Sequence, residues 1–479
     1  MNLVSPPPGI GTRITRYGTI LAVSGIVCKI MLLVYTVLAV EILGREGFGR
    51  IEYFIEMAII FSVLIDFGLE QTVTREASRR REEAGEMLYP LLLFRLAAAL
   101  AGGVAMAAFL WLLAQPGHTG LLIFCSITYF FVISVIMLVR AIVRGLELMV
   151  YEGAANILDK VAHIGTAIAL LYVLPQLPLI VLCYTGGALV SLAIYLWVIL
   201  RRYGFHRAAY TYQDWIGWQK LAVPIGLSAV CILLLHREDT VMVNWIRGDD
   251  ETGLYRAPYR FLEGLFLFPQ VLAISAYPIF SKLFHEQQPF TQSAADLLRG
   301  LFLISLPIAV GGSCTGMNMM RWLTPELGRA GGIVFILLLW SLPFIYANFL
   351  LGTILNATDR QQLNFKASAW GLASNAVLNV PAIYGFGAYG AAVVTAVSQG
   401  VYCLIMLAYT RDFQLFTGLP RYTAIVAACL VMAALLSLID FAWYIEVPIG
   451  GGTYLAALAA FQGITWREMQ TLWSVVKQR

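Results

Sequence analysis

Long apolar stretches alternate with short polar segments along almost the whole chain. A helix needs roughly 20 apolar residues to cross a hydrocarbon core about 30 Å thick. By that measure we read fourteen spans, the first at residues 17–43 and the last at 443–462. No connecting segment is long enough to form a soluble domain. The pattern therefore predicts an all-α polytopic membrane protein with about 14 transmembrane helices.

Composition and charge support this reading and orient the chain. Hydrophobic residues make up 59% of the sequence and charged residues only 13%, with a mean hydropathy of +0.77. Of the 32 Lys and Arg residues, 22 fall on one side of the predicted membrane, 5 on the other and 5 within spans. Because cationic loops stay on the cytoplasmic side, both termini are predicted to be cytoplasmic. The net charge of +4 then indicates contact with membrane lipids and no nucleic acid.

The polar segments carry little that resembles an active site. The loops predicted to face outward are short, and no phosphate-binding loop of the Gly-x-x-x-x-Gly-Lys type occurs. His163 and His236 have no partner at metal-ligand spacing, and the seven cysteines lie singly in apolar runs. We therefore expect no enzyme activity, no cofactor and no metal site.

Charged residues inside predicted spans are costly in a bilayer, so each is a candidate functional residue. Lys29 lies near the middle of the first span. Residues 236–240 place Arg237 and Asp239 near the middle of the seventh span. Successive helical residues are about 100° apart, so this segment must face a wet cavity, neighbouring helices or both.

The eighth and second spans add charges on defined helix faces. Arg256, Arg260 and Glu263 follow one another at i, i+4 and i+7, and Glu52 and Glu56 share a face of the second span. Guanidinium groups donate paired hydrogen bonds that suit phosphate oxygens.

Two interpretations of these charges stay open. In the first, Lys29, Arg237, Arg256 and Arg260 line a solvated cavity that binds an anionic substrate. In the second, the charges pair with one another and only hold helices together, for example Arg260 with Glu263 or Arg237 with Asp239. The carboxylates Asp239, Glu263, Glu52 and Glu56 are accordingly candidates for ion pairing or for carrying a coupling proton.

Short motifs along the chain resemble those of a known family. The segment AVEILGREGFG at 39–49 is similar to a signature of bacterial polysaccharide flippases, members of the multidrug, oligosaccharidyl-lipid and polysaccharide exporter superfamily. Further similar motifs occur in order at 66–69, 253–257, 277–278, 355–357 and 379–392. One departure is Glu41, where the family pattern often has arginine.

The resemblance implies two six-helix lobes arranged as a V around a central cationic cavity, followed by two further helices. The expected parts are a cytoplasmic lead at 1–16, a first lobe at 17–202, a cytoplasmic linker at 203–220, a second lobe at 221–410, two helices at 411–463 and a cytoplasmic amphipathic tail at 464–479.

The same resemblance implies a flippase in the bacterial cytoplasmic (inner) membrane. Its substrate would be an oligosaccharide linked to undecaprenyl pyrophosphate, moved to the outer leaflet by alternating access and driven by an ion gradient. Other polysaccharide assembly proteins are candidate partners. The alternatives are a flippase for the lipid-linked peptidoglycan precursor, a drug or cation antiporter of the same superfamily, and, in a different class, a membrane enzyme of polysaccharide assembly.

Overall fold

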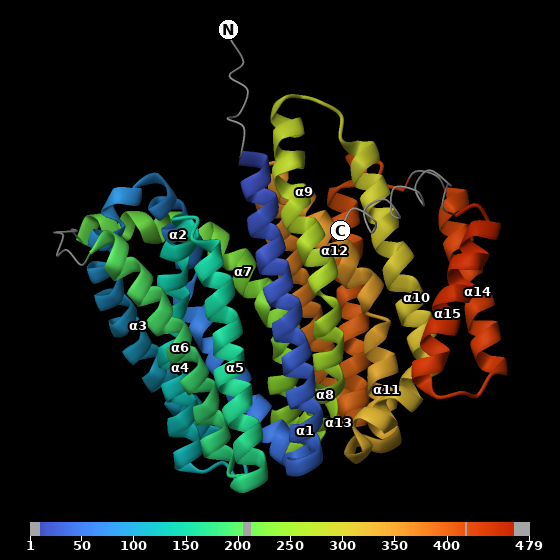
Figure 1. The fold of residues 1–479 in the computed structure, drawn as a ribbon, viewed down its shortest axis with the longest axis horizontal. Helices are drawn as coiled ribbons and strands as arrows, with labels where there is room; N and C mark the ends of the chain where they lie inside the picture. The colour runs from blue at the N-terminus through green and yellow to red at the C-terminus, as the bar shows by residue number, and fades with distance from the viewer. Residues whose placement is uncertain (1–9, 205–211, 417–418, 464–479) are drawn as a thin grey trace. The chain divides into compact units, whose positions relative to one another are not determined.

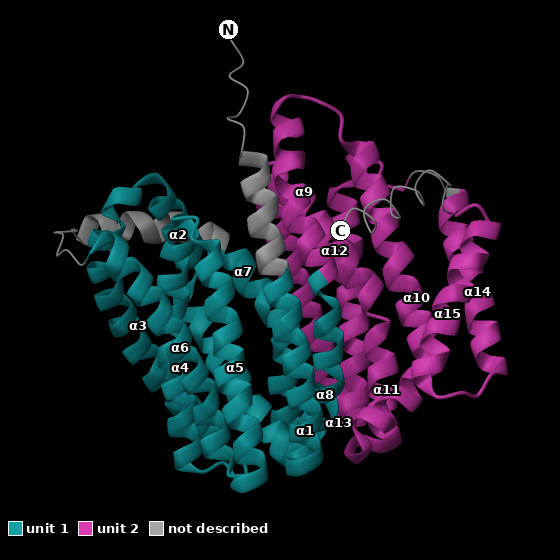
Figure 2. Ribbon diagram, in the orientation of Figure 1, with its two compact units in different colours: residues 1–267 teal, residues 268–479 magenta. Residues whose placement is uncertain are grey.

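The computed structural model describes residues 10–204, 212–416 and 419–463, and the side chains among them except those of 10–22, 212–225 and 419. These residues form helices and no strand, which confirms the all-α prediction. The C-terminal tail and much of the N-terminal lead and of the linker lie outside the described residues. The chain divides into two compact units, Met1–Leu267 and Phe268–Arg479 (Figure 2).

Unit 1 contains the first eight α-helices (Figure 1). They are α1 (Ile10–Asp66), α2 (Leu69–Arg79), α3 (Ala84–Leu112), α4 (Gly120–Gly145), α5 (Met149–Val173), α6 (Leu177–Tyr203), α7 (Tyr212–Arg247) and α8 (Asp249–Leu265), with a short 3-10 helix η1 (Arg81–Glu83) before α3. The described parts of α7 and α8 pack against α1, so unit 1 extends beyond the predicted first lobe at 17–202. The predicted lobes are thus a different division of the chain, and they stay a prediction.

Unit 2 contains the remaining helices, most of them long and apolar. They are α9 (Leu267–His285), α10 (Thr291–Leu323), η2 (Pro325–Leu327), α11 (Gly328–Leu339), α12 (Leu342–Ala357), α13 (Gln361–Tyr409), η3 (Arg411–Phe413), α14 (Leu419–Leu438) and α15 (Trp443–Ala460). α14 and α15 pack together, and both contact α10. A small apolar core that includes Ile425, Met432 and Leu458 lies where the three helices meet.

Two very long helices bend sharply at glycines. Gly44 in α1 has φ 69° and ψ 179°, and Gly387 in α13 has φ 58° and ψ −135°. Side chains with a Cβ rarely adopt these conformations, so glycine permits the chain to turn back there. Each bend falls between two predicted spans.

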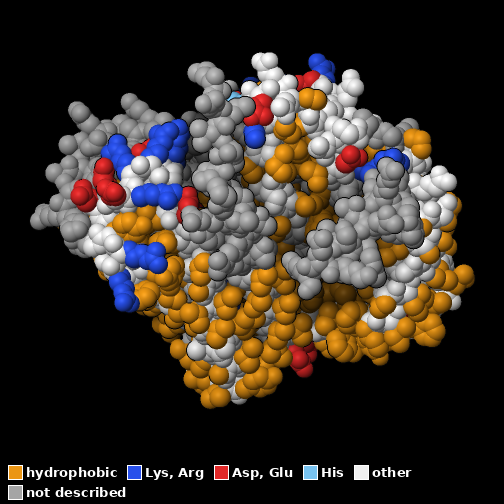
Figure 3. Space-filling model, turned by 45° about the horizontal axis from the view of Figure 1, so that its top comes forward, with side chains coloured by type: hydrophobic (Ala, Val, Ile, Leu, Met, Phe, Trp, Pro, Cys, Tyr) orange, Lys and Arg blue, Asp and Glu red, His pale blue; other side chains and the backbone are white. Residues whose placement is uncertain are grey.

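By length and composition, ten helical segments of the described residues qualify as membrane spans. This supports a multi-pass membrane protein, whereas the count of fourteen spans stays a prediction. Large apolar side chains are exposed on the outer faces of these helices: Leu112, Val173, Val104 and Tyr384 are each at least 70% exposed. On the face shown in the space-filling view, hydrophobic side chains cover much of the lower part, and most of the visible charged side chains lie in the upper part (Figure 3). Such a surface suits lipid as its solvent.

Buried amides join the helices of unit 2. Asn348 in α12 donates to the Gln399 side chain in α13 at 3.0 Å. Across the bend of α13, Asn375 donates to the Ser398 hydroxyl at 3.0 Å. These neutral contacts fix the two halves of α13 against each other and against α12 without burying a net charge.

Candidate functional site

The second half of α1 and the helix α8 form the backbone of the site. Each begins just after a left-handed glycine, Gly44 or Gly248, and each carries a second glycine five residues further on, Gly49 or Gly253. A Cβ added at Gly49 would overlap the backbone of Asp249 and Gly253, so the two helices touch main chain to main chain. Small residues permit such close approach between membrane helices.

The pairing is parallel and in register. Gly49 lies opposite Gly253, and Glu52 is paired with Arg256, both 204 positions apart along the chain. Two further pairs, Glu56 with Arg256 and Glu52 with Arg260, are displaced by four residues in either direction. In this stretch α1 therefore presents glutamates where α8 presents arginines.

Six of the predicted site residues form one buried ionic network. Glu52 Oε2 accepts hydrogen bonds from Arg256 Nε at 2.9 Å and from Arg260 Nη2 at 2.6 Å. Glu263 accepts from Arg256 at 3.2 Å and from Arg260 at 3.3 Å. Glu56 is ion-paired with both Arg256 and Arg237. We call these three arginines and three glutamates the α1–α8 network.

Burial and charge balance define what this network can do. The side chains of Arg256 and Glu56 are 0% exposed, whereas that of Arg237 is 21% exposed. Ionised groups in a dry interior are tolerated when they are paired and hydrogen-bonded. Three positive and three negative charges cancel, so the network by itself is neutral.

Lys29 breaks this balance. It lies on α1, is half-buried, and has no ion pair with any residue whose side chain the structure describes. Its ammonium group is within electrostatic range of Glu263 and of all three arginines. An anion that approaches Lys29 would therefore meet a cation that has no ion-pair partner of its own among the described side chains.

The structure brings together most of the predicted site residues, but not in every predicted pair. Arg260 and Glu263 are paired, as the ion-pair interpretation expects. Arg237 is paired with Glu56, whereas Asp239 accepts a hydrogen bond from the Tyr255 hydroxyl at 2.7 Å.

Sequence reasoning missed the contact between the second and eighth spans. A signal for it exists in the chain. Residues 44–56 and 248–260 share one spacing: a glycine, a second glycine five positions later, and charged residues eight and twelve positions after the first glycine.

A polar cluster joins one end of the α1–α8 pair to the loop before α4. Asp249 accepts hydrogen bonds from Arg50 at 2.7 Å and from Asn244 at 2.8 Å, and lies 3.1 Å from His118. The His118 ring stacks on Tyr53 with 5.4 Å between centroids. This cluster holds the turn between α7 and α8 against the bend of α1.

A second ionic cluster lies towards the other end of unit 1. Glu70 on α2 accepts from Arg140 at 3.1 Å and from Arg144 at 2.8 Å, and Arg144 also contacts Glu152. Arg95, whose side chain is 0% exposed, is paired with Asp66. These pairs tie α4 to α2 and α5, and α3 to the end of α1, so we assign them a structural role.

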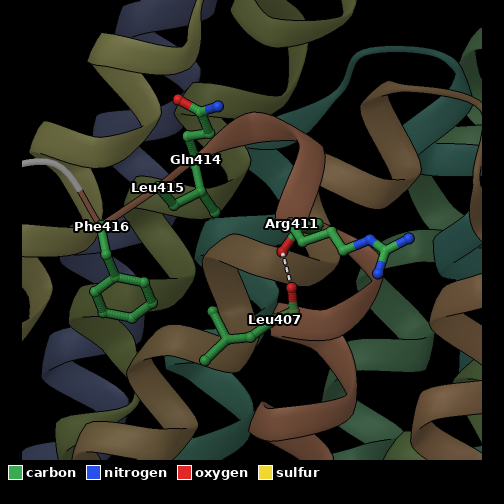
Figure 4. Close-up of a pocket in the computed structure, with 6 residues that line it drawn as sticks. Leu407, Arg411, Gln414, Leu415 and Phe416 are labelled. Carbon is green, nitrogen blue, oxygen red and sulfur yellow. Dashed lines mark hydrogen bonds between the residues drawn. The ribbon is translucent and has the colours of Figure 1, made fainter.

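A metal site and a small-molecule cavity are two further kinds of site to consider. Among the described residues, no group of three His, Cys, Asp or Glu side chains is placed to hold a metal ion. A cavity of about 340 Å³ lies in unit 2, lined by Leu407, Thr410, Arg411, Gln414, Leu415 and Phe416. In Figure 4 the polar side chains of Arg411 and Gln414 point away from each other, so these two groups do not converge on one point in the cavity.

Comparisons with known proteins agree with this fold. One curated relative, the probable flippase AglR of Haloferax volcanii, is 25% identical over 166 residues, which cover 34% of this chain and 35% of that protein. The match thus spans about a third of the relative. It is named as a flippase and not as an enzyme.

Among solved structures, the lipid II flippase MurJ in an inward closed conformation is similar with a TM-score of 0.73 and 16% identity, covering 92% of this chain and 98% of that one. An inward-facing multidrug resistance MATE family transporter of the MOP superfamily has a TM-score of 0.60 and 15% identity, covering 81% and 96%. At these identities the likeness shows a shared fold. The model of one family, described as polysaccharide biosynthesis protein, matches residues 14–284. Since this match includes more than half of the chain and all of the α1–α8 network, the chain belongs to the polysaccharide biosynthesis protein family.

Proposed function

We propose that this protein is a flippase that moves an undecaprenyl-pyrophosphate-linked oligosaccharide from the cytoplasmic to the outer leaflet by alternating access. The observation that carries the proposal is Lys29, an unpaired cation beside a buried ionic network in a chain of this family. A pyrophosphate is an anion that such a charge attracts, and the apolar helix surfaces suit the lipid tail.

In this proposal the arginines of the network bind the substrate only after they release their glutamate partners. Arg237, Arg256 and Arg260 are neutralised by glutamates in this structure. We assign the first contact with the substrate to Lys29, and later contacts to the arginines as phosphate oxygens replace carboxylate oxygens. Both are oxygen acceptors for the same guanidinium donors, so the exchange keeps each arginine satisfied.

The test is flipping of a fluorescent undecaprenyl-pyrophosphate oligosaccharide in proteoliposomes. Selective movement of this lipid supports the proposal. The fold is shared with a lipid II flippase and a multidrug transporter, so lipid-linked peptidoglycan precursor and a cationic drug serve as competing cargoes in matched vesicles. Transport of either one without the oligosaccharide lipid would overturn the proposed substrate.

A single substitution sharpens this test. Lys29→Gln removes the uncompensated charge without leaving a buried partner unpaired. We expect flipping to fall about tenfold or more, because a hydrogen bond to a charged group contributes about 1.5–3 kcal/mol. The matched control is Lys366→Gln, which removes an exposed lysine of α13. Equal flipping rates in the two variants would contradict the role of Lys29.

The cellular setting follows from the proposed substrate. We place the protein in the bacterial cytoplasmic (inner) membrane with both termini in the cytoplasm, where a lipid-linked oligosaccharide meets the inner leaflet. Other polysaccharide assembly proteins are then its natural partners. Cysteine labelling from either side of the membrane, at positions introduced near each terminus, tests the orientation.

A further inference from the structure

Most acidic side chains within the helices of unit 1 are committed to partners. Glu52, Glu56 and Glu263 are each paired with arginines. A carboxylate held by a guanidinium stays ionised, because protonation would leave the arginine unpaired. Asp239 accepts a hydrogen bond from Tyr255. These groups hold structure, and they are poor carriers of a proton that must come and go.

Glu238, on α7, differs from all of them. Its Oε1 atom is buried without a hydrogen-bond partner, and no ion pair joins Glu238 to a residue whose side chain the structure describes. The residue as a whole is half-buried. It neighbours Arg237 in sequence, but consecutive side chains of a helix point about 100° apart, and Arg237 is directed to Glu56 on α1.

The charged groups around α7 do not compensate for this isolation. α7 packs against α1, α8 and α2, and the charged side chains described on these helices have other partners or are exposed. On α1 and α8, beside the α1–α8 network and Lys29, Arg45, Glu46, Arg50, Asp66, Asp249 and Asp250 are in other ion pairs, Glu251 has a contact elsewhere and Glu41 is exposed. On α2 they are Glu70, Glu76 and the exposed Arg75 and Arg79. Within electrostatic range of Glu238 lies the like charge of Asp239, on the same helix. The surroundings therefore oppose a negative charge on Glu238.

Elementary electrostatics gives such a group two states. A carboxyl group in a dry, unpaired position keeps its proton, because ionisation there lacks both solvation and a counter-charge. The same group in contact with water ionises near its ordinary pKa of about 4.3. A conformational change that wets Glu238 thus releases a proton, and by linkage a bound proton favours the conformation in which Glu238 is dry.

We propose that Glu238 is a proton-binding site through which the transmembrane proton gradient drives the conformational cycle. The choice of a proton over a metal cation rests on the number of ligands. A proton needs only the carboxyl group, whereas a cation such as sodium needs several oxygen ligands, and no group of three or more His, Cys, Asp or Glu side chains among the described residues is placed to hold a metal ion. The link to transport rests on the proposed function, whereas the protonation of Glu238 does not.

The first experiment needs no substrate. Infrared spectroscopy of the purified wild-type protein near pH 7 is expected to show the C=O stretch of a protonated carboxyl group that disappears in Glu238→Gln. The matched control, Asp239→Asn, should retain that component. Glutamine has the size of protonated glutamate and no charge, so Glu238→Gln should fold; Glu238→Asp, which keeps a carboxyl group, is the second variant. An unchanged spectrum in Glu238→Gln would overturn the proposal.

The second experiment tests coupling in proteoliposomes with the undecaprenyl-linked oligosaccharide. If one proton is coupled to each lipid, a pH gradient of one unit shifts the distribution of the lipid by about tenfold. Glu238→Gln should retain exchange without a gradient and lose this shift. A full response in Glu238→Gln, or a wild-type response to a sodium gradient alone, would overturn the proposal. If the wild type moves no oligosaccharide lipid at all, the proposed function fails, and the infrared result alone decides the state of Glu238.

Discussion

The two units bury polar groups of opposite character. Unit 1 joins its helices with ionised side chains, most densely in the α1–α8 network, whereas unit 2 joins α12 and the two halves of α13 with amides and hydroxyls. Ionic contacts are strong but depend on every partner, since one missing charge leaves another buried and unpaired. Neutral contacts are individually weak and independent. Removal of one buried polar side chain is therefore expected to lower stability more in unit 1 than in unit 2.

The largest effect is expected from Arg256→Ala. This substitution removes the cation that contacts Glu52, Glu56 and Glu263. Breaking a buried ionic contact on one side costs about 3–5 kcal/mol. Thermal unfolding of the purified protein in detergent should show a much lower midpoint than wild type. The control is Arg201→Ala, at an exposed arginine near the end of α6. Similar unfolding midpoints for the two variants would contradict the charge dependence that we assign to unit 1.

An intermediate effect is expected from Gly49→Ala. The new methyl group would collide with main-chain atoms of α8, which cannot rotate away. Overpacking of this kind costs about 1–3 kcal/mol and should push the two helices apart. Gly165→Ala in α5 is the matched control, because a Cβ there meets nothing within 4 Å. Unfolding midpoints distinguish the two, and Gly165→Ala should be neutral or slightly stabilising because alanine favours a helix more than glycine does. A control as destabilised as Gly49→Ala would show that the collision with α8 is not the cause.

The smallest effect is expected in unit 2, from Asn375→Ala. The substitution deletes the hydrogen bond to Ser398 across the bend of α13 and the one that Asn375 accepts from Asn379. Such bonds between membrane helices contribute about 0.6 kcal/mol on average. The unfolding midpoint should therefore shift by a small fraction of the Arg256→Ala shift. Ser374→Ala, which deletes a hydrogen bond within one helix, is the control. A loss as large as that of Arg256→Ala would mean that unit 2 is no more tolerant than unit 1.

The helical character of the protein was predictable because it depends on local composition. Runs of apolar residues specify helices in lipid whatever their neighbours are. The pairing of Arg260 with Glu263 was also predictable, since three residues along one helix bring the side chains together.

The contact between Glu52 and Arg256 was not predictable in the same way. It joins residues 204 positions apart, and hydropathy says nothing about which spans are neighbours. The isolation of Glu238 was hidden for the same reason. Its neighbours in sequence are charged, and only the direction of each side chain in space separates it from them.

The register of α1 and α8 has a consequence for how such a protein can be built. α1 and α8 pair in parallel at equivalent positions. This is the geometry of two copies of one surface related by a twofold axis. Identical copies would set glutamate against glutamate, or arginine against arginine, and repel. Here one copy carries Glu52 and Glu56 where the other carries Arg256 and Arg260. A homodimer of either half could not form this contact, so its assembly requires two halves of different sequence.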